Sequence, residues 1–239
     1  MPNDSLNKGA IMMRRSLQIG LILGMALVLT ACSKEGGFKS AINQELEGKY
    51  QCLGSVGSDV SVFSSLRVAD MDSLRQNMAV IAQTKTNGQL EPLSAKEIKE
   101  AAALNSLVKV GLLKKTQETQ QATNWNSQPV DGKFYVMDLY NLTDAGKKTV
   151  KGKNFLGNPR NFCYAHPQVD KILNYIEQDS GGRKVAAVKY SYKYVDVASW
   201  AKDDAVKAAF PEIEETLNAT DNTDEMVLTK GDKGWDTGL

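Results

Sequence analysis

The spacing of apolar residues along the chain predicts a series of short helices and strands. Apolar residues recur every four positions over Phe38–Leu46, which predicts a short helix because such residues share one helix face. Asp72–Ala82 has a similar spacing and predicts a second helix. The glycine- and serine-rich segment Gly54–Ser65 predicts a loop between them, and Asn87-Gly88 predicts an interruption after the second helix.

A longer helix is predicted from Ser94 to Val110. Ser94 and Glu97 have the spacing of a capping box, in which each side chain accepts a hydrogen bond from the backbone N–H of the other residue. The apolar residues that follow keep helical spacing, and Gly111 is typical of the residue just after a helix end.

A β-hairpin is predicted after this helix. The polar run Lys114–Ser127 and the turn sequence Pro129–Gly132 precede an apolar run, Phe134–Tyr140, that predicts a strand. Thr143 is a typical N-cap for the helical turn that follows. Trp125 would lie at the tip of the hairpin, where it is hard to bury locally, so it is a candidate contact for a partner.

The last third of the chain predicts antiparallel strands with helical segments. Tyr190, Tyr192 and Tyr194 alternate with polar residues, which is typical of a half-buried strand. We expect this strand to pair with Val169–Glu177 across the intervening glycine turn. An amphipathic helix, a strand and a turn are predicted at Trp200–Phe210, Met226–Leu228 and Lys230–Gly234.

These elements predict an α+β fold. The helical part would span residues 38–155 and the antiparallel β-containing part residues 156–239, either as two parts or as one continuous domain. The composition fits a globular chain, since its 24% of charged residues are interspersed with 42% hydrophobic ones.

Residues 73–151 resemble a winged-helix unit. The resemblance rests on a helix that ends before Leu112-Leu113, a hairpin, and then the sequence Leu142-Thr143 that opens the next element. In winged-helix transcription factors this unit binds DNA. Here the helix that corresponds to the recognition helix mixes lysine with glutamate and forms no basic stripe, so we interpret the unit as a scaffold or a protein contact.

The N-terminus predicts export. Arg14 and Arg15 precede an apolar run, Leu17–Leu29, that is shorter than the roughly 20 residues of a transmembrane helix. Leu29-Thr30-Ala31-Cys32 resembles the lipobox of bacterial lipoproteins. The alternative is a signal anchor with an incidental cysteine, and the true start of the chain is Met1 or one of the methionines before Arg14.

The lipobox resemblance implies a location and a partner. Residues 1–31 would be removed as a signal peptide, Cys32 would carry fatty acids such as palmitate, and residues 32–37 would form a tether. Ser33 stands where an aspartate would resemble an inner-membrane retention signal. We therefore expect an anchor in the lipid bilayer at the periplasmic face of the outer membrane.

The charge balance argues against nucleic acid as a partner. The full chain has a formal net charge of +1, and residues 1–31 contain three basic residues and one acidic residue, so the remaining 208 residues carry about −1. Nucleic-acid binding needs a clustered excess of lysine and arginine. We expect no nucleic acid among the partners.

Two cysteines remain after Cys32. In an oxidising compartment, Cys52 and Cys163 predict a disulfide that stabilises the fold by about 4–5 kcal/mol in the chain-entropy model. The alternative is two buried free thiols.

Other chemistry is weakly indicated. Cys163 and His166 have the spacing of half a zinc site or of a thiol nucleophile and its base, but the second zinc-binding pair is missing. The sequence has no phosphate loop, dinucleotide glycine pattern or Gly-x-Ser-x-Gly elbow. We therefore predict a protein that is not an enzyme and needs no metal or cofactor.

The leading hypothesis is a membrane-anchored protein-interaction module of the cell envelope, similar in organisation to uncharacterised Gram-negative lipoproteins. Trp125 is its candidate partner contact, and the partner would be another envelope protein. The alternative is a binder of a small molecule or cell-wall fragment through the face of Tyr190, Tyr192 and Tyr194.

Overall fold

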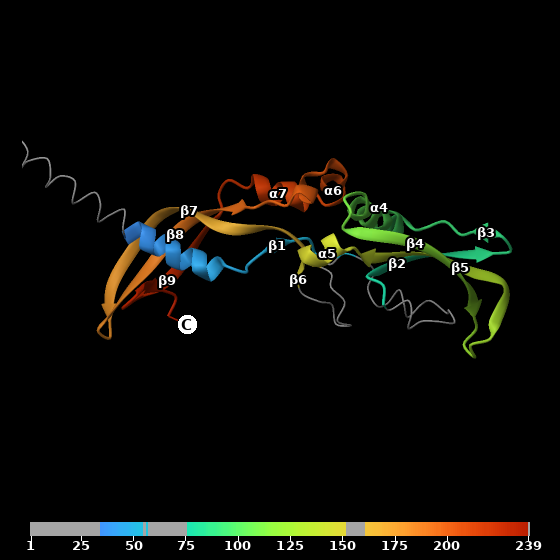
Figure 1. Cartoon of the computed structure of the whole chain (residues 1–239), viewed down its shortest axis with the longest axis horizontal. Coiled ribbons are helices and arrows are strands. Elements are labelled where there is room, and N and C mark those ends of the chain that lie inside the picture. Colours follow the sequence, from blue (N-terminus) through green and yellow to red (C-terminus); the bar gives the residue numbers. More distant parts are fainter. Residues whose placement is uncertain (1–33, 55, 57–75, 152–160, 239) are drawn as a thin grey trace, which may run out of the picture. The chain divides into compact units, whose positions relative to one another are not determined.

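A computed structural model describes residues 34–54, 56, 76–151 and 161–238 (Figure 1). The chain forms two compact units. Unit 1 contains the described residues 34–45, Val169–Tyr192 and 223–238, and unit 2 contains the rest. Each unit is therefore assembled from segments that are separated in the sequence. The predicted division, by contrast, was a single boundary after residue 155.

Unit 1 is a helix on an antiparallel sheet. Residues 34–46 are helical, and Phe38 packs between the rings of Tyr175 and Trp235, with ring centroids 5.1 and 5.0 Å away. Its strands belong to β7 (Asn161–Ser180), β8 (Arg183–Val195), β9 (Thr223–Gly231) and β10 (Gly234–Asp236), in the order β7-β8-β9-β10; residues 161–168 of β7 and 193–195 of β8 are part of unit 2. The buried side chains of Ala186 and Val188 show why β8 alternates: one face of the sheet is covered.

Unit 2 contains a second sheet, of four strands in the order β3-β2-β5-β4. Its elements are β2 (Ala79–Thr86), β3 (Gln89–Leu90), α4 (Ala95–Lys109), β4 (Leu113–Thr123), β5 (Pro129–Leu142) and α5 (Asp144–Thr149). Leu104 and Leu107 of α4 are fully buried in the same cluster as Tyr140 of β5. The Tyr140 hydroxyl also donates to Asn105 Oδ1 at 3.1 Å, which fixes the helix against the sheet.

The rest of unit 2 surrounds the beginning of β7. Two short strands, β1 (Gln51–Cys52) and β6 (Val150–Lys151), pair with β7. Three short helical segments follow β8: η1 (Ser199–Lys202), α6 (Asp204–Ala209) and α7 (Glu212–Asn218). Trp200 of η1 is buried with its ring edge-on to Tyr164, so apolar packing holds these segments on the strand.

Several predicted elements are confirmed. The protein combines helices with antiparallel sheets, as an α+β fold requires. Ser94 accepts from the Glu97 N–H at 3.3 Å and the Glu97 carboxylate accepts from the Ser94 N–H at 2.7 Å, so the capping box forms. Thr143 caps α5 by accepting from the Gly146 N–H. β8 pairs with β7, and β9 and β10 form a hairpin at the predicted turn.

Other predictions were wrong. Residues 79–82 of the predicted helix Asp72–Ala82 belong to β2, where they pair with β5. A short run of apolar residues fits a helix or a strand, and here the pairing with β5 decides for the strand. The predicted hairpin forms from β4 and β5, but its turn lies at residues 124–128, and Pro129–Gly132, where the turn was predicted, belongs to β5. The predicted helix Trp200–Phe210 is divided into η1 and α6, and the Gly54–Ser65 loop lies largely outside the described residues.

The predicted tether is also wrong for residues 34–37, which are helical. Gly37 permits this packing, because a Cβ on it would lie only 3.3 Å from Trp235 Cδ1. Within the described part of the chain, no helix has the length and apolar character needed to cross a bilayer.

Candidate functional site

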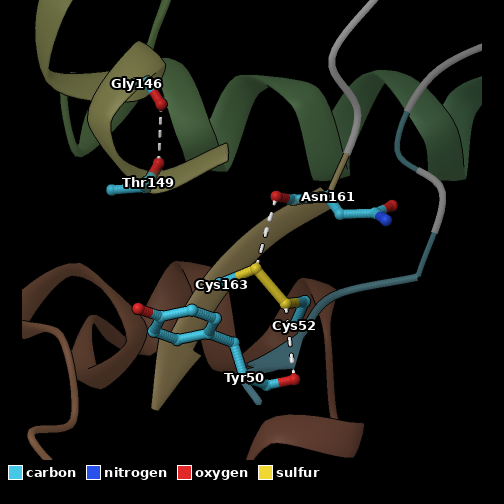
Figure 2. Close-up of a disulfide and its surroundings, with 6 residues drawn as sticks. All are labelled: Tyr50, Cys52, Gly146, Thr149, Asn161 and Cys163. Carbon is cyan, nitrogen blue, oxygen red and sulfur yellow. Dashed lines mark hydrogen bonds between the residues drawn. A yellow bond between two sulfur atoms is a disulfide. The ribbon is translucent and has the colours of Figure 1, made fainter. Parts of the chain in front are cut away.

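Cys52 and Cys163 form a disulfide, as predicted (Figure 2). The two residues are register partners in the antiparallel pair of β1 and β7, with Cα atoms 3.8 Å apart. The bond links positions 111 residues apart in sequence. It therefore holds a two-residue strand, too short to be stable alone, against the base of β7.

The disulfide argues against the hypothesis of an enzyme with Cys163 as its nucleophile. Each sulfur lies 3.6 Å from a backbone carbonyl oxygen, Tyr50 O or Asn161 O (Figure 2), and a disulfide sulfur has no proton to donate. Cys163 therefore cannot supply a thiolate while it is oxidised. His166 lies with Nε2 3.5 Å from the carboxylate of Asp196, which is exposed, so the nearest acidic neighbour of the histidine is at the surface.

Trp125 lies at the turn between β4 and β5, and 82% of its surface is exposed. The turn is well defined locally: Asn124 Oδ1 accepts from the N–H groups of Asn126 and Gln128, both at 2.9 Å. Ser127 has φ of 61°, in the left-handed region. The tryptophan thus projects from a turn that is held by its own backbone and by Asn124, so little backbone entropy would be lost in any contact made there.

The three tyrosines of β8 do not share one environment. Tyr190 is fully buried in unit 1, and its hydroxyl donates to the Asp224 carboxylate at 3.3 Å. Burial and the nearby Asp224 raise the pKa of Tyr190, so it remains a neutral donor. Tyr192 and Tyr194 are half-buried. Tyr190 is therefore a core residue, which leaves Tyr192 and Tyr194 as the members of the predicted ligand face that a ligand can reach.

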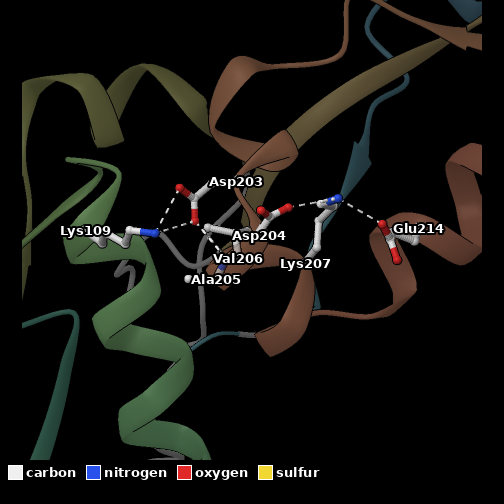
Figure 3. Close-up of polar contacts among 7 residues, drawn as sticks. All are labelled: Lys109, Asp203, Asp204, Ala205, Val206, Lys207 and Glu214. Atoms are coloured by element: carbon white, nitrogen blue, oxygen red, sulfur yellow. Dashed lines mark hydrogen bonds and ion pairs between the residues drawn. The ribbon is translucent and has the colours of Figure 1, made fainter.

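A charged cluster joins α4 to α6 within unit 2 (Figure 3). Lys109 Nζ lies 3.2 Å from Asp203, whose carboxylate also accepts from the N–H groups of Ala205 and Val206. Desolvation opposes ionisation, but these hydrogen bonds outweigh it and lower the pKa of Asp203. Lys207 bridges Asp204 and Glu214 nearby. Because every carboxylate of the cluster is paired or caps a helix, we interpret the cluster as structural.

A cavity of about 500 Å³ opens in unit 1 beside the helix over residues 34–46. Its charged lining consists of Lys34, Lys184, Lys230 and Glu177, and Trp235 forms part of its wall. Lys34 pairs with Glu177 at 2.5 Å, and this hydrogen bond raises the pKa of the lysine. The charged residues of the lining could not be recognised as a group from the sequence, because they are up to 196 positions apart, from Lys34 to Lys230. One signal in the sequence could have pointed to Lys184. The alternation of β8 places it on the same face of the strand as the buried Ala186, where a lysine is unexpected.

Comparisons of this chain with protein-family models, with curated proteins and with solved structures gave no match. Among residues 34–54, 56, 76–151 and 161–238, no group of three or more histidine, cysteine, aspartate or glutamate side chains could hold a metal ion. Cys32, the predicted lipidation site, lies outside the described residues. The candidate contact surfaces are therefore the β4–β5 turn and the cavity of unit 1.

Proposed function

We propose that this chain is a lipid-anchored periplasmic protein that binds another protein of the cell envelope through the β4–β5 turn. The observation that carries the proposal is the exposure of Trp125, 82% of which is open to solvent on a locally ordered turn. Tryptophan is among the residues that contribute most to protein–protein binding, and its ring loses little conformational entropy on contact.

The polar residues of the turn around Trp125 support a specific contact. Next to Trp125 in the turn, Asn126, Ser127 and Gln128 are all exposed and polar. A single large apolar side chain in such a turn supplies an anchor inside a polar rim, which is the usual arrangement of a protein–protein interface. The protein acts here as a binding module and not as an enzyme.

A winged-helix-like arrangement is the finer description that we propose for this part. Its support is the order of elements, with α4, then Leu112-Leu113, then the β4–β5 hairpin, then α5 capped by Thr143. In this description the hairpin is the wing, and it contacts protein instead of DNA. The mixed charges of α4, with Glu97 and Glu100 beside its lysines, disfavour a phosphate-binding role.

The lipid anchor is proposed from the sequence of Leu29-Thr30-Ala31-Cys32. The Cys52–Cys163 disulfide supports it, because structural disulfides persist in oxidising compartments such as the periplasm. Ser33 favours the outer membrane as the destination.

The anchor is tested by growing producing cells with an alkyne fatty acid and analysing the protein by mass spectrometry. We expect the label on Cys32, loss of the label in Cys32→Ser, and retention of the label in Cys52→Ser. An intact N-terminus without any label would contradict the anchor.

The partner is tested by photo-crosslinking in cells. A photo-reactive amino acid at Asn126 should give one reproducible crosslinked protein when Trp125 is present. The crosslink should be lost in Trp125→Ala and retained in Trp125→Phe, which keeps an aromatic ring. Equal crosslinking in the alanine and wild-type chains would contradict the proposal.

The alternative, a binder of a small molecule or cell-wall fragment through the tyrosine face, has less support. Tyr190 is buried. Neither the cavity of unit 1 nor the cleft between α4 and α6, which is lined mainly by alanines, includes Tyr192 or Tyr194.

A further inference from the structure

The cavity of unit 1 contains an excess of positive charge. Lys34, Lys184 and Lys230 contribute three ammonium groups, and Glu177 is the single carboxylate in the lining. Even with Lys34 paired to Glu177, two lysines remain to face an anionic ligand. Lys184 has no ion-pair partner in the part of the chain that the structure describes, and Lys230 Nζ lies 5.4 Å from the centre of the Trp235 ring.

The lining residues are held by ordered elements and do not depend on loops. Lys34 lies on the helix, Lys184 on β8 and Lys230 on β9. The helix is fixed to β7 because Lys39 Nζ donates to the Asp170 carbonyl at 2.6 Å and Asn43 accepts from the Val169 N–H at 2.9 Å. The cavity is therefore formed before any ligand arrives, which lowers the entropic cost of binding.

Position along the chain indicates what the ligand is. Lys34 follows Cys32 by two residues, so their Cα atoms can be no more than about 7 Å apart. The headgroup layer on each side of a bilayer is about 5–8 Å thick, the difference between the full and the hydrocarbon thickness shared by two leaflets. An acylated Cys32 would therefore hold Lys34 at the level of lipid phosphates.

We propose that this cavity binds the phosphate group of an anionic phospholipid, through Lys184 and Lys230, beside the acyl anchor. Lys34 and its pair Glu177 hold the end of the helix over the cavity, and Trp235 forms an apolar wall against which the glycerol of the headgroup can pack. The choice of a lipid as the source of the phosphate rests on the proposed acylation of Cys32. The basic lining of the cavity is a feature of the structure and does not depend on that proposal.

The test uses residues 32–239 with Ser in place of Cys32, so that no acyl chain is present. This chain keeps every residue that the structure describes. Vesicles of phosphatidylethanolamine and phosphatidylglycerol are compared with vesicles of phosphatidylcholine by co-sedimentation, and inorganic phosphate is titrated by calorimetry.

We expect binding to the phosphatidylglycerol vesicles that weakens about tenfold or more when Lys184→Gln and Lys230→Gln are combined, because basic residues at an anionic surface act together. The matched control combines Lys171→Gln and Lys189→Gln, which removes the same charge from exposed residues of β7 and β8 outside the cavity lining. This control should bind like the unsubstituted chain.

Binding of inorganic phosphate through the same two lysines, without binding to the phosphatidylglycerol vesicles, would support a phosphate site but overturn its assignment to a lipid. Failure to bind either probe, or equal weakening in both double variants, would overturn the proposal. Because the chain tested carries no lipid and an intact Trp125, these outcomes are independent of whether the anchor and the protein partner are found.

Discussion

Two long hairpins of this protein, β7–β8 and β4–β5, differ in how their sequences relate to their surroundings. In β8 the side chains of Ala186, Val188 and Tyr190 are buried while those between them are more exposed, which reflects the single covered face of the unit 1 sheet. In β4 the side chains from Lys114 to Thr119 are all exposed and polar. The alternation in the sequence therefore reveals β8 as a strand, whereas nothing of this kind reveals β4.

The turns of the two hairpins also differ. β7 and β8 are joined by Gly181-Gly182, both with positive φ, which is a tight two-residue connection. β4 and β5 are joined by a longer turn with Trp125 at its exposed end. Because Trp125 contributes little to any core, the comparison indicates that β7–β8 supports the fold whereas the tip of β4–β5 is available for binding.

The largest loss of stability is expected when the disulfide at the beginning of β7 is removed. Replacing both Cys52 and Cys163 with serine should lower the free energy of unfolding by about 4–5 kcal/mol in the chain-entropy model, since the bond closes a loop of more than 100 residues. Equilibrium denaturation measures the change, and the unsubstituted chain under reducing conditions is the control. Identical unfolding of the oxidised chain and the double variant would show that β1 needs no covalent link.

The next largest loss of stability is expected on the covered face of the β7–β8 hairpin. Phe38→Ala removes a fully buried ring that packs on Tyr175 and Trp235, and should cost about 3–5 kcal/mol. Hydrogen exchange followed by mass spectrometry should show faster exchange in β7 and β8. The control Ile98→Ala, at a side chain that is 57% exposed, should change stability little. Unchanged exchange in Phe38→Ala would mean that the helix does not stabilise the sheet.

A smaller effect is expected in the helix that packs with the β4–β5 sheet. Ser94→Ala removes the N-cap of α4 and should lower stability by about 1 kcal/mol. Ser94→Asp should retain most of the stability, because aspartate is also a good N-cap. Denaturant titration of the three chains tests this, and a fully stable alanine variant would show that the capping box is redundant.

The smallest effect on stability is expected at the tip of β4–β5. Trp125→Ala should change the free energy of unfolding by less than about 0.5 kcal/mol, because the side chain is exposed. The same variant should lose the crosslinked partner. A large loss of stability would show that Trp125 packs in the fold and would remove the main support for a binding role.

Local signals in the sequence determined the ends of helices and the covered strands. The capping box at Ser94, the cap at Thr143 and the alternation in β8 depend on residues a few positions apart, so they could be predicted correctly. The exposed position of Trp125 followed in the same way from its polar neighbours. The pairing of Cys52 with Cys163 was predictable because only two cysteines remain after Cys32.

Tertiary structure alone decided the rest. β2 has a helical spacing of apolar residues and becomes a strand only because β5 pairs with it. β4, an edge strand, has no apolar pattern from Lys114 to Thr119 because its side chains there are exposed on both faces of the sheet. The cavity of unit 1 brings together Lys34, Lys184 and Lys230 from three distant segments. Such contacts depend on which strands pair across the whole chain, and no short window of sequence contains that information.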